Sequence, residues 1–179
     1  MQVESRTPYG ADRTLEAILS STSSDSHMWN LIFIQLVLEE HGYHVTNLGA
    51  CVPVEALVDR CAALPPTVVV LSTVNGHGHL DGALAVNRLR QIPSLAITPI
   101  VIGGKLGIQA SSLDHVQHLR AAGFDAVFGD TAADLSEFSA FLRRVAADSF
   151  AGAPSCDVAV ARTPLEIARA AAARGAGLA

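Results

Sequence analysis

The sequence predicts a single α/β domain with a doubly wound, five-stranded parallel sheet of the flavodoxin or Rossmann type. Two observations support this class. Short apolar runs alternate five times with longer segments of helical periodicity. The short runs are apolar at consecutive positions, as is typical of strands buried on both faces. The order expected for five such strands is 2-1-3-4-5.

A buried strand and an amphipathic helix are expected to open the domain. Leu15–Leu19 is a short apolar run that ends in a serine-rich stretch, which suits a buried strand. The segment from about His27 to Glu40 follows, with Gly42 where a C-terminal helix cap is expected. Its apolar residues recur three and four positions apart, on one face of a helix: Leu31, Ile34, Val37 and Leu38.

Proline marks the boundaries of the second helix. Tyr43–Leu48 is predicted to be the second strand. A helix follows from Pro53 to about Leu64, because proline is favoured in the first turn of a helix and Pro65–Pro66 would end it. Thr67–Ser72 is predicted to be the third strand, since its valines favour a sheet.

The second half of the sequence repeats the alternation. A segment rich in glycine and histidine, Asn75–His79, separates the third strand from the next helix. The remaining elements are a helix at about Leu80–Gln91, a strand at Pro99–Ile102, a helix at Ser112–Ala122, a strand at Asp125–Phe128, and a last helix after Gly129–Thr131 to about Ala147.

Charge and composition disfavour several classes of protein. The 179 residues include 17 acidic and 12 basic side chains, a net charge of -5, so a nucleic-acid binder is not expected. The apolar runs are too short to span a bilayer, and the N-terminus lacks a signal-peptide core. Three cysteines without a CxxC pair favour a reducing, cytoplasmic compartment. The domain is expected at 14–148, between a flexible leader at 1–13 and an Ala/Arg-rich tail at 149–179 that is loose or partly helical.

Asp25 and His27 form the first candidate pair, in the loop after the first strand. In one interpretation, Ser24 or Asp25 caps the following helix and His27 is a solvent-facing residue of its first turn. In the other, the Asp25 carboxylate holds one ring nitrogen of His27 and leaves the second free to bind a metal. The sequence leaves both interpretations open.

Two further loops lie where a doubly wound sheet binds ligands, at the carboxyl ends of its strands. Ser72–Asp81 combines two hydroxyls with glycines that let the backbone approach a ligand closely. Gly103–Gly104 removes side chains from the same edge, although a tight turn would also explain it. No third ligand has a spacing that would make a zinc site with His77 and His79, and the pair His115 and His118 is expected at the surface. The sequence contains no GxGxxG, Walker A or GxSxG motif.

Together, these loops resemble cobalamin-binding domains, above all the family of small (sigma) subunits of glutamate mutase, also called methylaspartate mutase. The matching motifs are Asp25-x-His27, then Ser72-Thr73-Val74-x-Gly76-x-Gly78, then Gly103-Gly104, and Glu40–Gly49 and Pro53–Glu55 are also similar. The resemblance covers about Thr14 to Arg144. It departs from the family at Asn30, where Asp-x-His-x-x-Gly has its glycine, and at Lys105, where the family usually has an uncharged polar residue.

The resemblance implies that the chain binds adenosylcobalamin base-off, with the nucleotide tail inserted along the sheet. His27 would be the lower axial ligand of the cobalt, and Asp25 would hydrogen-bond the other ring nitrogen. Ser72, Thr73, Val74 and Gly76 would line the tail pocket, Gly103 and Gly104 would give the tail room, and Gly129 and Thr131 would close its far end. The cofactor-binding residues implied are Asp25, Ser26, His27, Asn30, Ser72, Thr73, Val74, Gly76, Gly103, Gly104, Gly129 and Thr131.

The resemblance also implies a division of labour between two chains. The small subunit carries the cofactor, and a large, barrel-type subunit binds the substrate. The pair would be an isomerase that interconverts glutamate and 3-methylaspartate by a radical mechanism. No catalytic residue is expected on this chain alone.

Three alternatives stay open at this point. The chain could carry cobalamin for a methyltransferase or another radical enzyme, although such methyltransferase modules usually have an N-terminal helical cap for which residues 1–13 are too few. It could be a cofactor-free relative, given Asn30. A receiver-type signalling domain would need a phosphorylatable aspartate after the third strand, where this chain has Ser72 and Thr73.

Overall fold

A five-stranded parallel sheet forms the centre of the domain in the computed structural model, which describes residues 14–107 and 112–151. The strand order is β2-β1-β3-β4-β5, and all four neighbouring pairs are parallel, which confirms the predicted class and order. The strands are β1 (Leu15–Ser21), β2 (Tyr43–Asn47), β3 (Val68–Thr73), β4 (Ile100–Gly104) and β5 (Ala126–Phe128).

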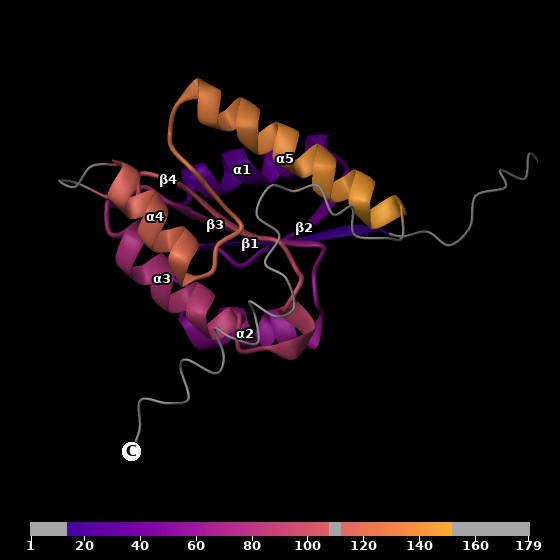
Figure 1. Ribbon diagram of the computed structural model, residues 1–179, viewed down its shortest axis with the longest axis horizontal. Helices are drawn as coiled ribbons and strands as arrows, with labels where there is room; N and C mark the ends of the chain where they lie inside the picture. Colours follow the sequence, from indigo (N-terminus) through magenta and orange to yellow (C-terminus); the bar gives the residue numbers. More distant parts are fainter. Residues whose placement is uncertain (1–13, 108–111, 152–179) are drawn as a thin grey trace, which may run out of the picture.

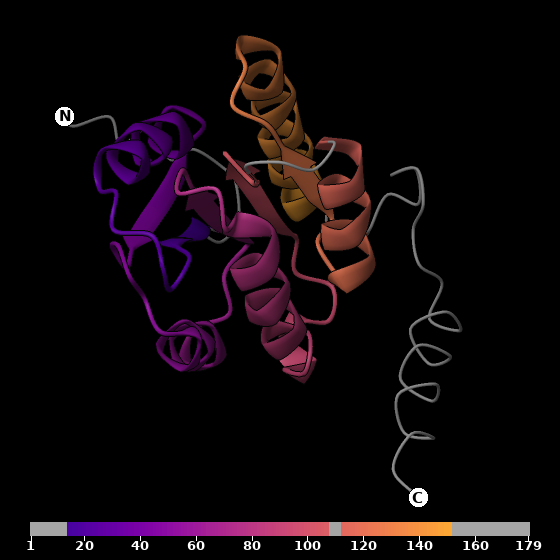
Figure 2. The same cartoon turned by 90° about the vertical axis from the view of Figure 1, so that its left-hand side faces the viewer.

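Helices cover both faces of this sheet (Figures 1 and 2). Two helices, α1 (Trp29–Glu40) and α5 (Ala132–Ala151), lie on one face. The opposite face is covered by α2 (Val54–Ala63), α3 (Gly78–Leu89) and α4 (Ser112–Ala122). A short 3₁₀ helix, Pro93–Leu95, precedes β4. None of the helices in the described part of the chain is long and apolar enough to cross a membrane.

The burial of β3 explains why its sequence is apolar at every position. Val68 and Val70 pack into the cluster under α1 and α5, whereas Val69 and Leu71 pack into the cluster under α2, α3 and α4. All four side chains are almost fully buried. Because successive strand residues point to opposite faces, a sheet covered on both faces requires apolar residues at all of them.

Strands β1 and β4 each end two residues later than predicted, because pairing with β3 continues beyond their apolar runs. β1 includes Ser20 and Ser21, which pair with Leu71 and Ser72. β4 includes Gly103 and Gly104, which pair with Ser72 and Thr73. The interpretation of Gly103–Gly104 as a turn is therefore wrong: both glycines belong to the carboxyl end of a central strand.

Helix boundaries also differ from the predicted ones. α1 begins at Trp29 rather than near His27, and α5 continues to Ala151, four residues beyond the predicted end. The 3₁₀ helix was not predicted from the sequence. Residues 1–13 and 152–179, which hold the expected leader and nearly all of the expected tail, lie outside the described residues.

Candidate functional site

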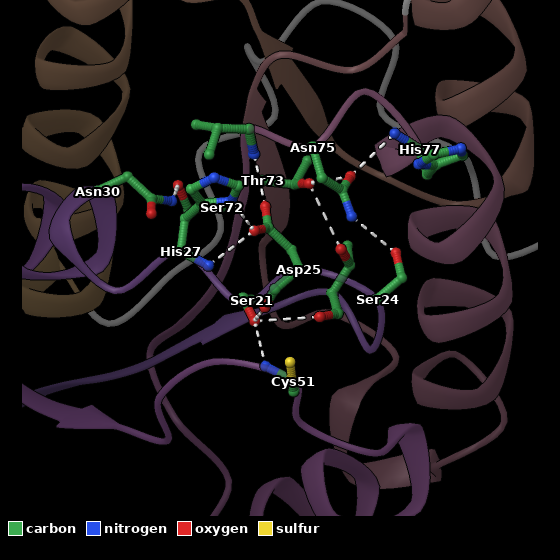
Figure 3. Close-up of polar contacts among 12 residues, drawn as sticks. Ser21, Ser24, Asp25, His27, Asn30, Cys51, Ser72, Thr73, Asn75 and His77 are labelled. Carbon is green, nitrogen blue, oxygen red and sulfur yellow. Dashed lines mark hydrogen bonds and ion pairs between the residues drawn. The ribbon is translucent and has the colours of Figure 1, made fainter.

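The carboxylate of Asp25 lies at the centre of a network that joins the loops after β1 and β3 (Figure 3). Oδ1 accepts hydrogen bonds from the backbone N–H of His27 at 2.9 Å and from its ring Nδ1 at 2.7 Å. Oδ2 accepts a hydrogen bond from the backbone N–H of Val74 at 2.6 Å. The Asp25 carbonyl accepts from Ser21 Oγ and from the backbone N–H of Cys51. Asp25 is thus held by residues at or just after the ends of β1, β2 and β3.

The environment of Asp25 favours its ionised form. Burial by itself would raise the pKa of this carboxyl, because no part of Asp25 is exposed to solvent. The hydrogen bonds from His27 and Val74 outweigh burial, so the pKa lies below the ordinary value of 3.8. An ionised carboxylate only accepts hydrogen bonds, which places a proton on Nδ1 of His27.

His27 presents its other ring nitrogen to solvent. Its side chain is 48% exposed, and no described residue is hydrogen-bonded to Nε2. With the proton on Nδ1, Nε2 of the neutral ring carries a lone pair, which is the form that binds a metal ion. The helix-cap interpretation of this loop is wrong, because the N-cap residue of α1 is Met28 and no side chain caps the helix.

A second set of hydrogen bonds ties the β1 loop to α3. Asn75 Nδ2 donates to Ser24 Oγ at 2.8 Å (Figure 3). The Ser24 hydroxyl in turn donates to Asp81 Oδ2. The Asn75 side-chain oxygen accepts from the backbone N–H of His77 and from Thr73 Oγ1. These contacts hold the loop that carries His27 against the loop that follows β3.

A pocket of about 290 Å³ opens beside this network, between α1 and α5 and over the ends of β3, β4 and β5. Apolar residues form most of its wall, among them Trp29, Phe33, Phe128 and Phe138. Trp29, Phe33 and Phe138 were not predicted from the sequence as site residues. The sequence does contain a signal for Trp29 and Phe33. Helix α1 carries apolar side chains on an exposed face as well as on its buried face, and these two residues belong to the exposed one.

Asn30 stands in the wall of this pocket, on the first turn of α1. It is 5% exposed, and its Nδ2 donates to Ser72 Oγ at 2.9 Å. Its Oδ1 is buried without a hydrogen-bond partner. In the described part of the chain, only one other buried side-chain atom, Nε2 of His115, shares that condition.

Close contacts with Thr73 explain two of the motif glycines. Gly104 has φ +102°, and a Cβ there would lie 2.1 Å from the carbonyl oxygen of Thr73. At Gly78 a Cβ would lie 2.3 Å from Cγ2 of Thr73. Both distances are far below van der Waals contact, so these positions require glycine.

The structure brings seven of the twelve predicted cofactor-binding residues to the pocket wall: Asn30, Ser72, Val74, Gly103, Gly104, Gly129 and Thr131. Asp25, His27 and Thr73 lie in the adjoining hydrogen-bond network. Gly76 is buried in a turn with φ +80°, and Ser26 is exposed beside His27. Whether these residues bind a cofactor stays a prediction.

Thr131 has a structural role besides its place in the pocket wall. It precedes α5, and its Oγ1 accepts a hydrogen bond from the backbone N–H of Asp134 at 3.2 Å. The Asp134 carboxylate accepts from the backbone N–H and the hydroxyl of Thr131 in return. This reciprocal arrangement is a helix capping box. The hydrogen bond from the Thr131 hydroxyl is the main reason that the pKa of Asp134 lies below its ordinary value.

The remaining histidines do not form a metal site in the described part of the chain, where no group of three or more His, Cys, Asp or Glu could hold a metal ion. The expectation that His115 lies at the surface is wrong in part. Its ring stacks on that of His79, with centroids 4.1 Å apart, and Nε2 is buried. His118 is exposed, as predicted.

Comparison with protein families gives one match that spans most of the domain. The family model described as the B12 binding domain matches residues 15–139. That range contains all five strands, the Asp25–His27 pair and the pocket wall up to Phe138.

Three curated relatives share part of the sequence. The glutamate mutase sigma subunits of Halobacterium salinarum and Treponema denticola are 30% and 25% identical over 112 and 117 residues. These matches cover 62% and 65% of the chain, and 74% and 84% of the relatives. The HTH-type transcriptional repressor CarA of Myxococcus xanthus is 33% identical over 88 residues, which are 49% of the chain and 30% of CarA's length.

Solved structures resemble the fold at lower identity. A cobalamin-binding protein from Desulfitobacterium hafniense is 20% identical with a TM-score of 0.60, over 74% of the chain and 60% of that protein. The receiver domain of a sensor histidine kinase from Pseudomonas aeruginosa is 18% identical with a TM-score of 0.54, over 73% of the chain and 96% of that domain. At these identities the likeness shows the fold alone, and the fold is shared by both kinds of protein.

Proposed function

The chain belongs to the B12 binding domain family, and from this premise we propose that it is the cobalamin-carrying subunit of an adenosylcobalamin-dependent mutase that interconverts glutamate and 3-methylaspartate. The two sigma subunits support the finer assignment, because the matches cover about three quarters or more of their lengths. CarA supports it less, because the match covers 30% of that protein.

The residues present fit a cobalamin bound through a histidine. His27 is half exposed, its Nε2 lies outside the hydrogen-bond network, and the carboxylate of Asp25 fixes the tautomer that a metal requires. Beside it lies a largely apolar pocket whose wall includes the backbone of Gly103 and Gly104. A flat aromatic base at the end of a nucleotide tail suits such a pocket.

The chain's own residues would bind and orient the cofactor, whereas adenosylcobalamin supplies the radical chemistry through its weak cobalt–carbon bond. His27 Nε2 would face the cobalt, and Asp25 would hold the proton on Nδ1 and keep the ring in place. The hydrogen bond that Asn75 donates to Ser24, and the one that Ser24 donates to Asp81, would keep the His27 loop from moving away from β3. Trp29 and Phe33 would exclude water from one side of the tail.

An exposed apolar stripe on α1 supports a protein partner. Its side chains are between 45% and 65% exposed, and they follow directly after His27: Met28, Trp29, Ile32, Phe33 and Leu36. Those on the helix are spaced three and four positions apart, so they lie along one face. Contiguous exposed apolar surface of this kind marks an interaction site. We assign it to the large, barrel-type subunit that would bind the substrate.

The observation that carries the proposal is the half-exposed His27 ring held by a buried carboxylate, and a spectrum tests it. The purified chain is mixed with hydroxocobalamin or adenosylcobalamin, desalted, and compared with His27→Ala. We expect the wild-type chain to retain a red chromophore whose visible spectrum reports histidine ligation, and the variant to lose that signature. A wild-type chain that elutes colourless, or a spectrum that is the same in the variant, would contradict the proposal.

His44 offers a matched control for this experiment. Its Nδ1 lies 3.0 Å from Oε2 of Glu16, so it also forms an imidazole–carboxylate pair, but it lies on β2 and does not line the pocket. His44→Ala should leave the spectrum unchanged. The mutase assignment needs a second measurement, in which the loaded chain is combined with a glutamate mutase large subunit. Methyl transfer instead of isomerisation would favour the alternative of a methyltransferase carrier.

A further inference from the structure

The exposed apolar stripe of α1 divides into two rows of side chains. Trp29 and Phe33, four positions apart, line the pocket, whereas Met28, Ile32 and Leu36 do not. Successive residues of a helix are rotated by about 100°, so residues four apart lie in one row along its surface. We call Trp29 and Phe33 the rim row, and Ile32 and Leu36 the outer row. The rim row belongs to the side of α1 that borders the pocket.

Asn30 and Ile34 form the inner part of this pocket-facing side. Each follows a rim residue by one position and also lines the pocket. Asn30 is buried, and Ile34 packs against the core under α1 and α5. The rim row is open to solvent in contrast, with Trp29 65% and Phe33 45% exposed. A ligand that enters the pocket can therefore contact these two aromatic side chains directly.

The rings of the rim row differ from the other aromatic rings of the pocket wall in having no aromatic neighbour. Phe128 and Phe138 meet edge to face, with ring centroids 5.3 Å apart. Among the residues that the structure describes, neither Trp29 nor Phe33 makes a ring contact. Because aromatic side chains bind best to flat, apolar or aromatic surfaces, these two rings suit an aromatic ligand group.

We propose that Trp29 and Phe33 stack against the flat base of the corrinoid's nucleotide tail, and that only the outer row of the stripe is left for the protein partner. The inference rests on the proposed function, which places the tail in this pocket. The base would lie between the rim row of α1 and the wall to which Phe128 and Phe138 contribute. Apolar side chains would then cover both of its faces.

Stacking of this kind supplies affinity without reading the edge of the base. Every aromatic base has a flat face, so contact with an aromatic side chain favours binding for bases of different edge chemistry. Stacking also buries part of the large apolar surface that Trp29 exposes. The rim row therefore strengthens the binding of any tail that ends in an aromatic base, and contributes nothing to a corrinoid that lacks the tail.

Cobinamide, which has the corrin ring without the phosphate, ribose and base, isolates the contribution of the tail. The wild-type chain and its variants are titrated with hydroxocobalamin and with hydroxocobinamide, and the dissociation constants are read from the visible spectrum. In Trp29→Ala we expect cobalamin to bind about tenfold more weakly and cobinamide to stay within about twofold of wild type. Trp29→Phe keeps an aromatic ring, so its affinity for cobalamin should stay within about threefold of wild type.

Two exposed aliphatic side chains supply the comparisons. Leu84 on α3 is as exposed as Trp29, at 65%, and does not line the pocket. Leu84→Ala therefore controls for the removal of an exposed apolar side chain. Ile32→Ala tests the division of the stripe, and it should leave both affinities within about twofold of wild type.

The outcomes separate the stacking from the proposed function. In a Trp29→Ala chain that urea denaturation shows to be folded, unchanged cobalamin affinity or an equal loss for both corrinoids would overturn the inference and leave the proposed function standing. A loss in Ile32→Ala as large as in Trp29→Ala would overturn it as well. If the wild-type chain binds cobinamide too weakly to measure, the loss of cobalamin affinity in Trp29→Ala relative to Leu84→Ala decides. Failure of the wild-type chain to bind cobalamin would overturn the proposed function, and the stacking with it.

Discussion

Asp25 and His27 lie with Oδ1 and Nδ1 2.7 Å apart, yet the carboxylate is completely buried and the imidazole is half exposed. The pair therefore spans the boundary between the protein interior and solvent. The buried member is held by backbone N–H groups of two loops, and the exposed member extends outward from it. A rigid interior anchor with one free ring nitrogen outside is the geometry that a metal-binding histidine needs.

Replacing Asp25 with asparagine tests whether both carboxylate oxygens are needed. Oδ1 and Oδ2 both accept hydrogen bonds from N–H groups, whereas an amide presents an acceptor on one side only. In Asp25→Asn the side-chain NH₂ group must face a hydrogen-bond donor, either the backbone N–H of Val74 or the N–H groups of His27. We expect a loss of about 2–4 kcal/mol in the free energy of unfolding, measured by urea denaturation. Asp81→Asn, whose carboxylate bonds a hydroxyl that can reorient, should cost less than about 1 kcal/mol. Equal losses would contradict the special role of Asp25.

The pH dependence of stability follows from the lowered pKa of Asp25. The unfolded chain takes up a proton near the ordinary value of 3.8, and the folded chain does so only at lower pH. Stability from this group is therefore complete above that value and is lost as the pH falls through it toward the folded pKa. We expect the free energy of unfolding to drop between about pH 5 and pH 3, and to drop less in Asp25→Asn. Parallel curves for the two proteins would show that other carboxyls account for the acid sensitivity.

The sheet could be predicted from the sequence because its signals are local and consistent. The valines of Val68–Val70, the prolines before β3 and the glycines after α1 and α4 each mark a boundary or a buried run. For five such units the strand order follows from a general rule of doubly wound sheets. The helix face of Leu31 and Leu38 was also predicted correctly, and both are fully buried.

The errors arise where tertiary contacts override local preference. Glycine is unfavourable in strands, so Gly103 and Gly104 were placed outside β4, yet pairing with Ser72 and Thr73 extends the strand through both. The start of α1 was misplaced because Asp25 resembles a cap, whereas its carboxylate is used by His27 and Val74. The apolar pocket wall is formed by α1 and α5 together. It depends on which faces of these two helices meet, and the sequence pattern of a single helix does not predict that.

Substitutions at Thr131 can distinguish a role in capping α5 from a role in binding the cofactor. Its hydroxyl caps α5 by accepting a hydrogen bond from the Asp134 backbone N–H. Thr131→Ala should lower the free energy of unfolding by about 1 kcal/mol, and Thr131→Ser should restore it, because serine keeps the capping oxygen. Thermal or urea denaturation measures this. If Thr131 acts only as a cap, cobalamin affinity should change by less than about twofold in Thr131→Ala, a difference well under 1 kcal/mol. A larger loss in a fully folded variant would give Thr131 a direct contact with the cofactor.

The adjacent glycines of β4 provide a matched pair of substitutions with opposite expected outcomes. At Gly104, φ is +102° and a Cβ would lie 2.1 Å from the carbonyl oxygen of Thr73, so Gly104→Ala forces the two central strands apart. We expect a loss of about 3 kcal/mol or more in the free energy of unfolding. At Gly103 the nearest atom to a Cβ would be Cβ of Phe128 at 3.4 Å, an ordinary contact, so Gly103→Ala should cost less than about 1 kcal/mol.

Ligand binding then tells apart the two reasons for having glycine at these positions. Gly103 lines the pocket, and a methyl group there would take space from whatever enters it. Gly103→Ala should therefore fold normally and bind cobalamin more weakly, by about threefold to tenfold if the tail packs against β4. Gly104→Ala should show its main defect in stability rather than in binding. A Gly103→Ala protein with wild-type affinity would show that the tail does not pass over this strand, which contradicts the placement of the nucleotide in the pocket while leaving histidine ligation by His27 intact.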